Sequence, residues 1–303
     1  MSRTIGHHEA LGDPAAPVPA TAEDAYGHLA PLISRYWGPD MHYGLWDGPD
    51  DDAPFPVATE RLTAMVIERL GVTRADRVLD VGCGNGRPAA EIARRYEARV
   101  VGVDIDPAAL ARAREHADAR GVGHRVMFLA CGGPAVPFAD GAFQAALAFE
   151  STPHFDLGPL FAELSRVLAP GGRLVIETPC LAGPGRPDPA VDAYLRMLGG
   201  RSLETVDTHR RHARRHGLSL IDAEDVTGRV APSFHRLAAV LRAHRDELAG
   251  RYGPDRADAL LAIFDAWAAV RGVQASIMTF AKTGGGPACR PGARPGARGG
   301  GRG

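Results

Sequence analysis

Residues 77–87, RVLDVGCGNGR, form the stretch from which the fold of the whole chain can be inferred. The stretch begins as a short apolar strand that contains one acidic residue, Asp80. Three glycines follow at alternate positions, Gly82, Gly84 and Gly86, and allow both a sharp backbone turn and the close approach of a ligand. A proline and apolar residues at helical spacing come next. The stretch therefore predicts a strand, a glycine loop and a helix.

The acidic residues around this loop indicate which ligand it binds. A glycine loop at a helix N-terminus could hold the pyrophosphate of a dinucleotide, but the spacing here is G-x-G-x-G. Asp80 would also repel phosphate and would suit an ammonium group. Asp104 ends the next predicted strand, 18 residues after Gly86, close to the offset of about 20 residues at which a carboxylate binds ribose hydroxyls. These features favour S-adenosylmethionine over NAD.

Three motifs together resemble the class I S-adenosylmethionine-dependent methyltransferases: VLDVGCGNG at 78–86, VVGVDID at 100–106 and LSRVLAPGGRLVIETP at 164–179. The resemblance covers about residues 36–282. It implies an α/β fold with a Rossmann-like, doubly wound seven-stranded sheet, an N-terminal helical lid and a cap insertion before the last strands. The family's loop after the third strand carries an acidic residue for the adenine amino group, whereas this chain has Gly132 there. The resemblance implies that the cofactor is bound by Asp80, Gly82, Cys83, Gly84, Asn85, Gly86, Asp104, Ile105, Cys131, Gly132, Gly133 and Phe149.

Composition limits the function classes. The chain has 303 residues, a net charge of −1 and 45% hydrophobic residues, with no apolar run near 18 residues and no N-terminal signal pattern. We therefore expect a cytoplasmic protein that binds neither membranes nor nucleic acid, with a homo-oligomer left open. The four cysteines are scattered, without a C-x-x-C pair, so we expect no metal site.

The domain organisation follows from shifts in composition. We expect a disordered N-terminus over 1–20, a helical lid over 21–75, a cofactor-binding core over 76–180, a cap and substrate insertion over 181–217, the C-terminal part of the sheet with its helices over 218–283, and a disordered Gly/Arg tail over 284–303. The tail could bind RNA, but a flexible solvated tail is favoured. The basic segment 208–216, THRRHARRH, is interpreted as a solvated helix face, with an anion site as the alternative.

An aromatic segment precedes the core and has two interpretations. His42, Tyr43 and Trp46 lie within five positions, after a predicted amphipathic helix. They could hold that helix on the domain. Alternatively, similar segments close over cofactor and substrate in methyltransferases that act on sterols, tocopherols, prenyl diphosphates and glycosylated natural products. On the second interpretation His42 and Trp46 bind the substrate, as does Arg196 in the cap.

The residues after the fourth predicted strand are expected to act at the methyl acceptor. Ligands of doubly wound sheets bind beyond the carboxyl ends of the strands, where Glu150 and His154 lie. In sugar O-methyltransferases that the chain resembles, a histidine pair here and an acid after the fifth strand deprotonate a hydroxyl. This chain has Pro153 and Thr178 in place of one histidine and the acid. Prenyl diphosphate C-methyltransferases share the Glu-Ser-Thr run, which would assign the chemistry to Glu150 and Tyr43.

The sequence thus predicts an S-adenosylmethionine-dependent methyltransferase of secondary metabolism that acts on a small, hydrophobic natural product. Methyl transfer to O, C or N remains open, with Glu150, His154 and Tyr43 as the catalytic candidates. One alternative is a C-methyltransferase of a prenyl diphosphate or aromatic carbon. Two others are a non-catalytic S-adenosylmethionine-binding protein and a nicotinamide-dependent oxidoreductase.

Overall fold

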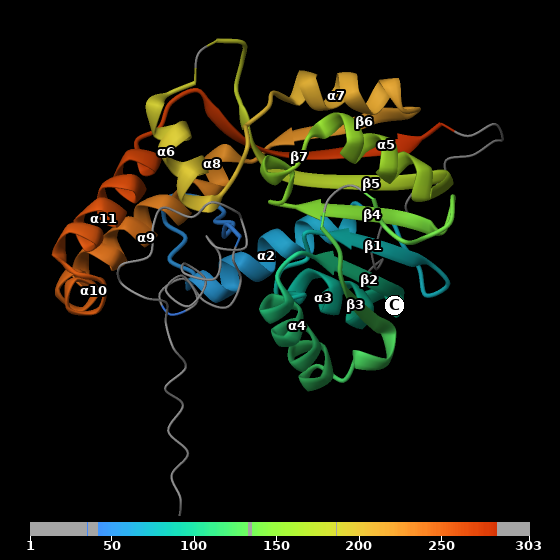
Figure 1. The fold of residues 1–303 in the computed structure, drawn as a ribbon, viewed down its shortest axis with the longest axis horizontal. Helices are drawn as coiled ribbons and strands as arrows, with labels where there is room; N and C mark the ends of the chain where they lie inside the picture. The colour runs from blue at the N-terminus through green and yellow to red at the C-terminus, as the bar shows by residue number, and fades with distance from the viewer. Residues whose placement is uncertain (1–34, 36–41, 133–134, 186, 284–303) are drawn as a thin grey trace, which may run out of the picture.

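The computed structural model describes residue 35 and residues 42–132, 135–185 and 187–283. In this part of the chain one seven-stranded sheet has the order β3-β2-β1-β4-β5-β7-β6 (Figure 1). The first five strands are parallel, and β7 runs antiparallel between β5 and β6. The predicted Rossmann-like sheet is confirmed. Its strands are β1 (Arg77–Val81), β2 (Arg99–Asp104), β3 (Val126–Ala130), β4 (Phe143–Phe149), β5 (Leu168–Leu181), β6 (Leu218–Asp225) and β7 (Val273–Lys282).

Helices cover both faces of the sheet. The apolar residues of α2 (Phe55–Glu68), α3 (Arg87–Tyr96) and α4 (Pro107–Ala119) pack into the core of one face. The residues of α5 (Leu157–Val167) and α7 (Val206–Arg215) pack into the other. Two of these helices begin at aspartate caps, because Asp106 accepts a hydrogen bond from the Ala108 N–H and Asp156 accepts one from the Gly158 N–H.

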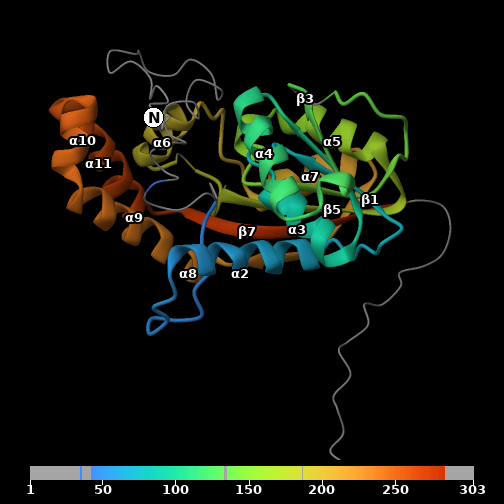
Figure 2. The ribbon, with the colours of Figure 1, turned by 90° about the horizontal axis from the view of Figure 1, so that it is seen from below.

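A further layer of helices lies beyond one end of the strands, at the left of Figure 1. In this layer α6, which precedes β6 in the chain, packs against α11, which follows β6. Tyr194 of α6 stacks on Trp267 of α11 with ring centroids 3.8 Å apart. Figure 2 shows the same helices gathered away from α3 and α4. The layer consists of α6 (Pro189–Leu198), α8 (Thr227–Val230), α9 (Pro232–Ala243), α10 (Arg245–Tyr252) and α11 (Pro254–Ala268).

The strand β5 extends to Leu181 because its last residues pair with the start of β7. The helical segment after α8 is divided into α9 and α10 at His244. The predicted disordered ends, the lid residues before His42 other than Arg35, and Gly133 lie outside the described residues.

Within the described residues, none of the helices has the length and apolar character needed to cross a membrane. In the same part of the chain, no group of three or more His, Cys, Asp or Glu side chains is placed to hold a metal ion.

Candidate active site

The glycine loop after β1 is held against the end of β2. The N–H groups of Gly82 and Cys83 both donate to the Val103 carbonyl, at 2.9 and 3.1 Å. The Gly84 N–H donates to Asp104 Oδ2 at 2.8 Å. All three glycines of the loop have positive φ angles, between +50° and +71°, which L-residues with side chains rarely adopt. The loop and the predicted ribose-binding acid therefore form one unit, and their contacts with the cofactor stay a prediction.

Two of the glycines are required by neighbouring atoms. A Cβ atom on Gly82 would lie 2.5 Å from Ser151 Cβ, and one on Gly86 would lie 2.5 Å from the Phe128 ring. Ser151 Oγ also donates to the Val81 carbonyl at 2.7 Å, which holds the segment after β4 beside the loop. By contrast, a Cβ on Gly84 would meet no atom within 4 Å. Gly84 thus borders open space, where a ligand can approach the backbone.

Asp80 is a buried carboxyl group, and no cation is among the described groups that shift its pKa. Its side chain is 1% exposed, and Oδ2 has no hydrogen-bond partner among the described residues. Burial, and then the nearby charge of Asp104, raise the pKa of Asp80 to about 7. A cationic ligand would relieve both effects. The site therefore fits a cofactor that carries an ammonium group at the glycine loop and ribose hydroxyls at Asp104.

Some of the other residues predicted to bind the cofactor lie at the same edge of the sheet as the glycine loop. The Cys131 N–H donates to the Asp104 carbonyl at 2.9 Å, so the segment after β3 joins the loop. Exposed Ile105 lies beside Gly132, since a Cβ on Gly132 would contact the Ile105 side chain at 3.0 Å. Gly132 stands where the family has the acid that binds adenine. These contacts place an apolar side chain and exposed backbone groups at that position.

Glu150 follows β4 in a strained conformation, with φ at +49°. Its N–H donates to the Glu177 carbonyl at 2.8 Å, and its Oε1 accepts a hydrogen bond of 2.8 Å from the Tyr43 N–H. Burial raises the pKa of Glu150 to about 8, although the bond from Tyr43 opposes this shift. Glu150 is therefore protonated near neutral pH.

Glu177 is a second acid at this position, and the sequence analysis did not identify it. Its side chain is fully buried in β5, and neither carboxyl oxygen has a hydrogen-bond partner among the described residues. Burial, and then the charge of Glu150, raise the pKa of Glu177 well above its usual range. The signal for Glu177 in the sequence is that it is the one charged residue in the run LVIETP. The comparison with the family's acid was made only at the following position, Thr178.

Two tyrosines complete this buried polar cluster. Burial raises the pKa of Tyr43, and Tyr194, Glu150 and Glu177 add to the rise. The structure thus brings together two of the predicted catalytic residues, Glu150 and Tyr43, with two residues that were not predicted.

His154 ends the short 3₁₀ helix η2 (Thr152–His154) directly after Glu150. Burial lowers the pKa of His154, while a hydrogen bond with the backbone of Gly199 and the charge of Asp104 oppose this shift. Gly199 ends α6, so the helical layer orients the imidazole. Thr152 Oγ1 donates to Thr178 Oγ1 at 2.8 Å, which fixes η2 on β5. Burial thus favours the uncharged imidazole of His154, which is the form that can accept a proton.

The residues predicted to bind substrate lie in three different surroundings. His42 is buried and stacks on Phe149 with centroids 4.4 Å apart. Trp46 is buried in a small separate cluster and donates from Nε1 to the Ala53 carbonyl at 3.0 Å, which supports the interpretation that it holds the N-terminal segment on the domain. Arg196 is exposed on α6. A direct role of these three in substrate binding stays a prediction.

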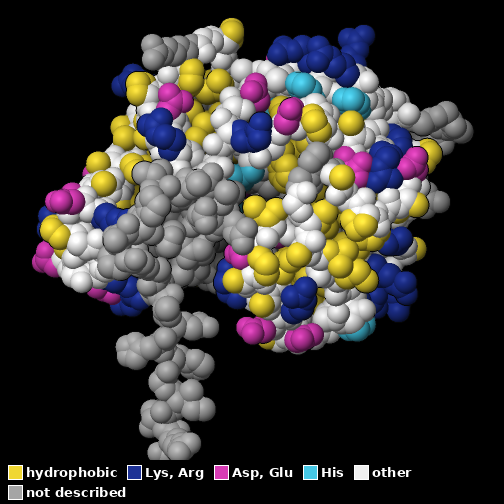
Figure 3. Space-filling model, in the orientation of Figure 1, with side chains coloured by type: hydrophobic (Ala, Val, Ile, Leu, Met, Phe, Trp, Pro, Cys, Tyr) yellow, Lys and Arg dark blue, Asp and Glu magenta, His cyan; other side chains and the backbone are white. Residues whose placement is uncertain are grey.

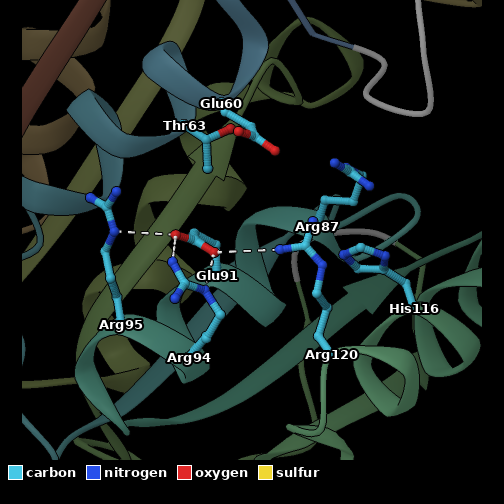
Figure 4. A pocket seen from close by; sticks show the side chains of 8 residues that line it. All are labelled: Glu60, Thr63, Arg87, Glu91, Arg94, Arg95, His116 and Arg120. Carbon is cyan, nitrogen blue, oxygen red and sulfur yellow. Dashed lines mark hydrogen bonds and ion pairs between the residues drawn. The ribbon is translucent and has the colours of Figure 1, made fainter. Parts of the chain in front are cut away.

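Two clusters of arginines lie outside this site. The basic residues of α7 gather at the upper edge of the face in Figure 3, and Arg210 and Arg211 both pair with Asp207, as expected of a solvated helix face. A pocket of about 160 Å³ between α2, α3 and α4 is centred on Glu91, which pairs with Arg94 at 2.7 Å and Arg95 at 3.2 Å (Figure 4). Neither cluster includes a predicted catalytic residue.

Comparisons with known proteins agree with this geometry. Residues 78–172 match the family model of a methyltransferase domain. Methyltransferase GfsG of Streptomyces halstedii is 34% identical over 69% of this chain and 77% of its own. The 27-O-demethylrifamycin SV methyltransferase of Amycolatopsis mediterranei is 33% identical over 76% of this chain and 85% of its own.

Solved structures show the same fold. The structure of the [4+2]-cyclase SpnF is 30% identical, with a TM-score of 0.76 over 88% of this chain and 99% of its own. Geranyl diphosphate C-methyltransferase from Streptomyces coelicolor A3(2) is 22% identical, with a TM-score of 0.66 over 87% of this chain and 100% of its own, a likeness of fold alone. The predicted family and its cofactor are confirmed: the chain belongs to the S-adenosylmethionine-dependent methyltransferases that act on small molecules.

Proposed function

We propose that the enzyme transfers the methyl group of S-adenosylmethionine to a hydroxyl oxygen of a small, hydrophobic natural product. The observation that carries this proposal is the half-buried imidazole of His154, which ends the 3₁₀ helix η2 after β4 and whose pKa is lowered by burial. The names of several relatives agree with transfer to oxygen, including the rifamycin enzyme and the O-methyltransferase cnsE of Penicillium expansum, which is 30% identical over 80% of its own length.

The chain's own residues would share the work as follows. Asp104 would bind the ribose hydroxyls, Asp80 would face the ammonium group, and the backbone at Gly84 would approach the methionine part. The cofactor supplies a methyl group that is already activated, so positioning of the acceptor provides most of the acceleration. His154 would accept the hydroxyl proton as the oxygen takes up the methyl group.

Glu150 is a poorer candidate for the base. A carboxyl group that holds its proton near pH 7 cannot accept another at that pH, although it can donate a hydrogen bond. We therefore assign Glu150 to orientation of the acceptor and His154 to proton transfer. This assignment disfavours C-methylation, in which Glu150 would have to remove a proton from carbon.

A prenyl diphosphate acceptor is disfavoured on charge. The groups that shift the pKa values of Glu150, Glu177 and Tyr43 include no lysine or arginine. The basic residues of α7 that pair with Asp207 are exposed on the outside of the domain. A diphosphate at Glu150 would thus meet two acids, and the described groups that shift the pKa values of these acids include no lysine or arginine to offset its charge.

Cyclisation of the acceptor is a second candidate function, because SpnF is 30% identical over 88% of this chain. Buried acids that keep their protons could polarise a carbonyl group in such a reaction by hydrogen bonding. A cyclase would convert its substrate to an isomer without consuming the cofactor's methyl group.

The experiment incubates the purified enzyme with methyl-labelled S-adenosylmethionine and a panel of hydroxylated polyketides, macrolactones, glycosides, phenols and prenyl diphosphates. Mass spectrometry detects a gain of one labelled methyl group, and carbon-13 NMR assigns it to oxygen or carbon. A labelled methyl ether supports the proposal. A labelled C-methyl product overturns it, and an unlabelled isomer supports the cyclase.

The cytoplasmic location, the absence of a nucleic-acid partner and a possible homo-oligomer remain predictions from the sequence.

A further inference from the structure

Two acids meet at the acceptor side of the site without a cation among the groups that shift their pKa values. Glu150 is half-buried at the end of β4, and Glu177 is fully buried in the neighbouring strand, beside it through the hydrogen bond from the Glu150 N–H to the Glu177 carbonyl. Two buried carboxylates so placed would repel each other and would lack hydration. The proposed base, His154, does not need either of them as a proton acceptor.

The geometry also favours one oxygen of Glu150 as the site of its proton. Oε1 accepts the Tyr43 N–H, and in a protonated acid the carbonyl oxygen is the better acceptor. This bond therefore favours a proton on Oε2. Because Glu150 is partly exposed whereas Glu177 is not, Oε2 of Glu150 is the atom from which a donor can face a bound molecule.

We propose that Glu150 and Glu177 form a pair of protonated acids, and that Glu150 donates a hydrogen bond from Oε2 to an uncharged oxygen atom of the acceptor. This contact selects acceptors that carry a ketone, a lactone or a second hydroxyl beside the hydroxyl that is methylated. This proposal rests on the proposed O-methylation. Glu177 acts as a positioning residue, because a second buried acid beside Glu150 opposes the ionisation of the pair.

The surroundings of the pair agree with this role. Tyr43, from the segment after residue 41, interacts with both acids, and Cys180 of β5 interacts with Glu177; each of these two groups is neutral when protonated. On the β7 side, Ile277 is the register partner of Glu177. A neutral pair among neutral donors favours an uncharged oxygen over a carboxylate or a phosphate. The pKa of Glu150, raised to about 8, agrees with a neutral pair at physiological pH.

The test compares three ligands with one carbon skeleton: a cyclic hydroxyketone, the corresponding hydroxy-ammonium compound and the hydroxycarboxylate. Their binding to the enzyme saturated with S-adenosylhomocysteine is measured by calorimetry between pH 6 and 9.5. We expect the ketone to bind at least about tenfold more tightly than either ion at pH 7, since one hydrogen bond to an otherwise unpaired buried group has that value. We also expect its affinity to fall as the pH rises through about 8. Preference for the ammonium compound would overturn the proposal.

The matched variants are Glu150→Gln and Glu150→Ala. An amide can donate from the same position, so Glu150→Gln should weaken ketone binding only about threefold, whereas Glu150→Ala should weaken it roughly 10- to 100-fold. Ketone binding by Glu150→Gln should also lose its pH dependence above pH 8. If Glu150→Gln were as damaging as Glu150→Ala, Glu150 would act as an anion, and the proposal would be wrong.

Infrared spectroscopy tests Glu177 without any ligand. The wild-type protein at pH 7 should show protonated carboxyl absorption, and part of it should disappear in Glu177→Gln and part in Glu150→Gln. Asp80→Asn provides the comparison for the third buried acid. Equal spectra in wild type and Glu177→Gln would show that Glu177 is ionised, against the proposal. Neither binding nor spectra require methyl transfer, so this test can fail while O-methylation still holds, or succeed without it.

Discussion

The backbone N–H of Tyr43 donates a 2.8 Å hydrogen bond to Oε1 of Glu150, across 107 positions of sequence. This bond joins the aromatic segment before the core to the acid that follows β4. His42 strengthens the junction, since its ring stacks on Phe149 and bonds to the Thr63 hydroxyl of α2 at 3.0 Å. The segment is therefore joined to the residues that we propose for the acceptor side of the site.

Asp104→Ala should weaken binding of S-adenosylmethionine and of S-adenosylhomocysteine alike. The variant loses the predicted ribose contact and the bonds from the Gly84 and Asp106 N–H groups, so we expect a loss of about 1.5 to 3 kcal/mol in binding free energy by calorimetry. Asp106→Ala is the control, because Asp106 caps α4. It should lower the unfolding free energy by about 1 kcal/mol and leave cofactor affinity nearly unchanged. Equal affinity in Asp104→Ala and wild type would exclude the ribose role.

Gly82→Ala should destabilise the fold more than Gly84→Ala. Both residues have positive φ, which costs roughly 1 kcal/mol for alanine. Only the new methyl group at Gly82 would collide with Ser151, which adds about 1 to 3 kcal/mol. Urea denaturation of both variants measures the difference. The double variant Gly82→Ala, Ser151→Gly should recover part of the loss, and an absence of recovery would argue against this contact.

The cofactor half of the site could be predicted because its signals are local. The glycine loop and Asp104 lie on consecutive elements, and parallel strands place their carboxyl ends together. The start of α5 depends on the cap at Asp156, which lies outside the apolar pattern of the helix.

The acceptor half could not be predicted because it is built by contacts between distant segments. The stacking of Tyr194 on Trp267 and the bond from the His154 ring to Gly199 depend on how α6 packs, which no short motif encodes. Glu177 was missed for the same reason. A strand pattern shows that a residue is inward-facing, but not that another acid follows the adjacent strand.

His154→Ala should lower kcat by about 100- to 10,000-fold, the usual contribution of a general base, with a much smaller change in cofactor affinity. Burial lowers the pKa of His154, so the neutral form is favoured in the folded protein. The wild-type rate should therefore fall only when the pH is below the usual pKa of a free histidine. His124→Ala, at an exposed position, is the control and should keep the wild-type profile. A rate that instead rises through pH 8 would assign the base to Glu150.

Asp80→Asn should stabilise the protein without cofactor and weaken its binding of cofactor. Because burial raises the pKa of Asp80 to about 7 in the folded state, the unfolded chain releases this proton at lower pH. The contribution of Asp80 to stability is complete below pH 4, falls as the pH rises toward 7 and then levels off. Removing the titration should add on the order of 2 to 4 kcal/mol to the unfolding free energy at pH 8, and much less at pH 4.

Denaturation of Asp80→Asn and wild type at both pH values measures this gain, with Asp50→Asn at an exposed loop position as the control. Calorimetry with S-adenosylmethionine measures the expected loss of affinity. A variant that gained stability and kept full affinity would separate Asp80 from the cofactor's ammonium group. Loss of both would mean that the buried carboxyl itself supports the fold. The two readouts together therefore decide whether the enzyme retains an unfavourable buried acid for the sake of cofactor binding.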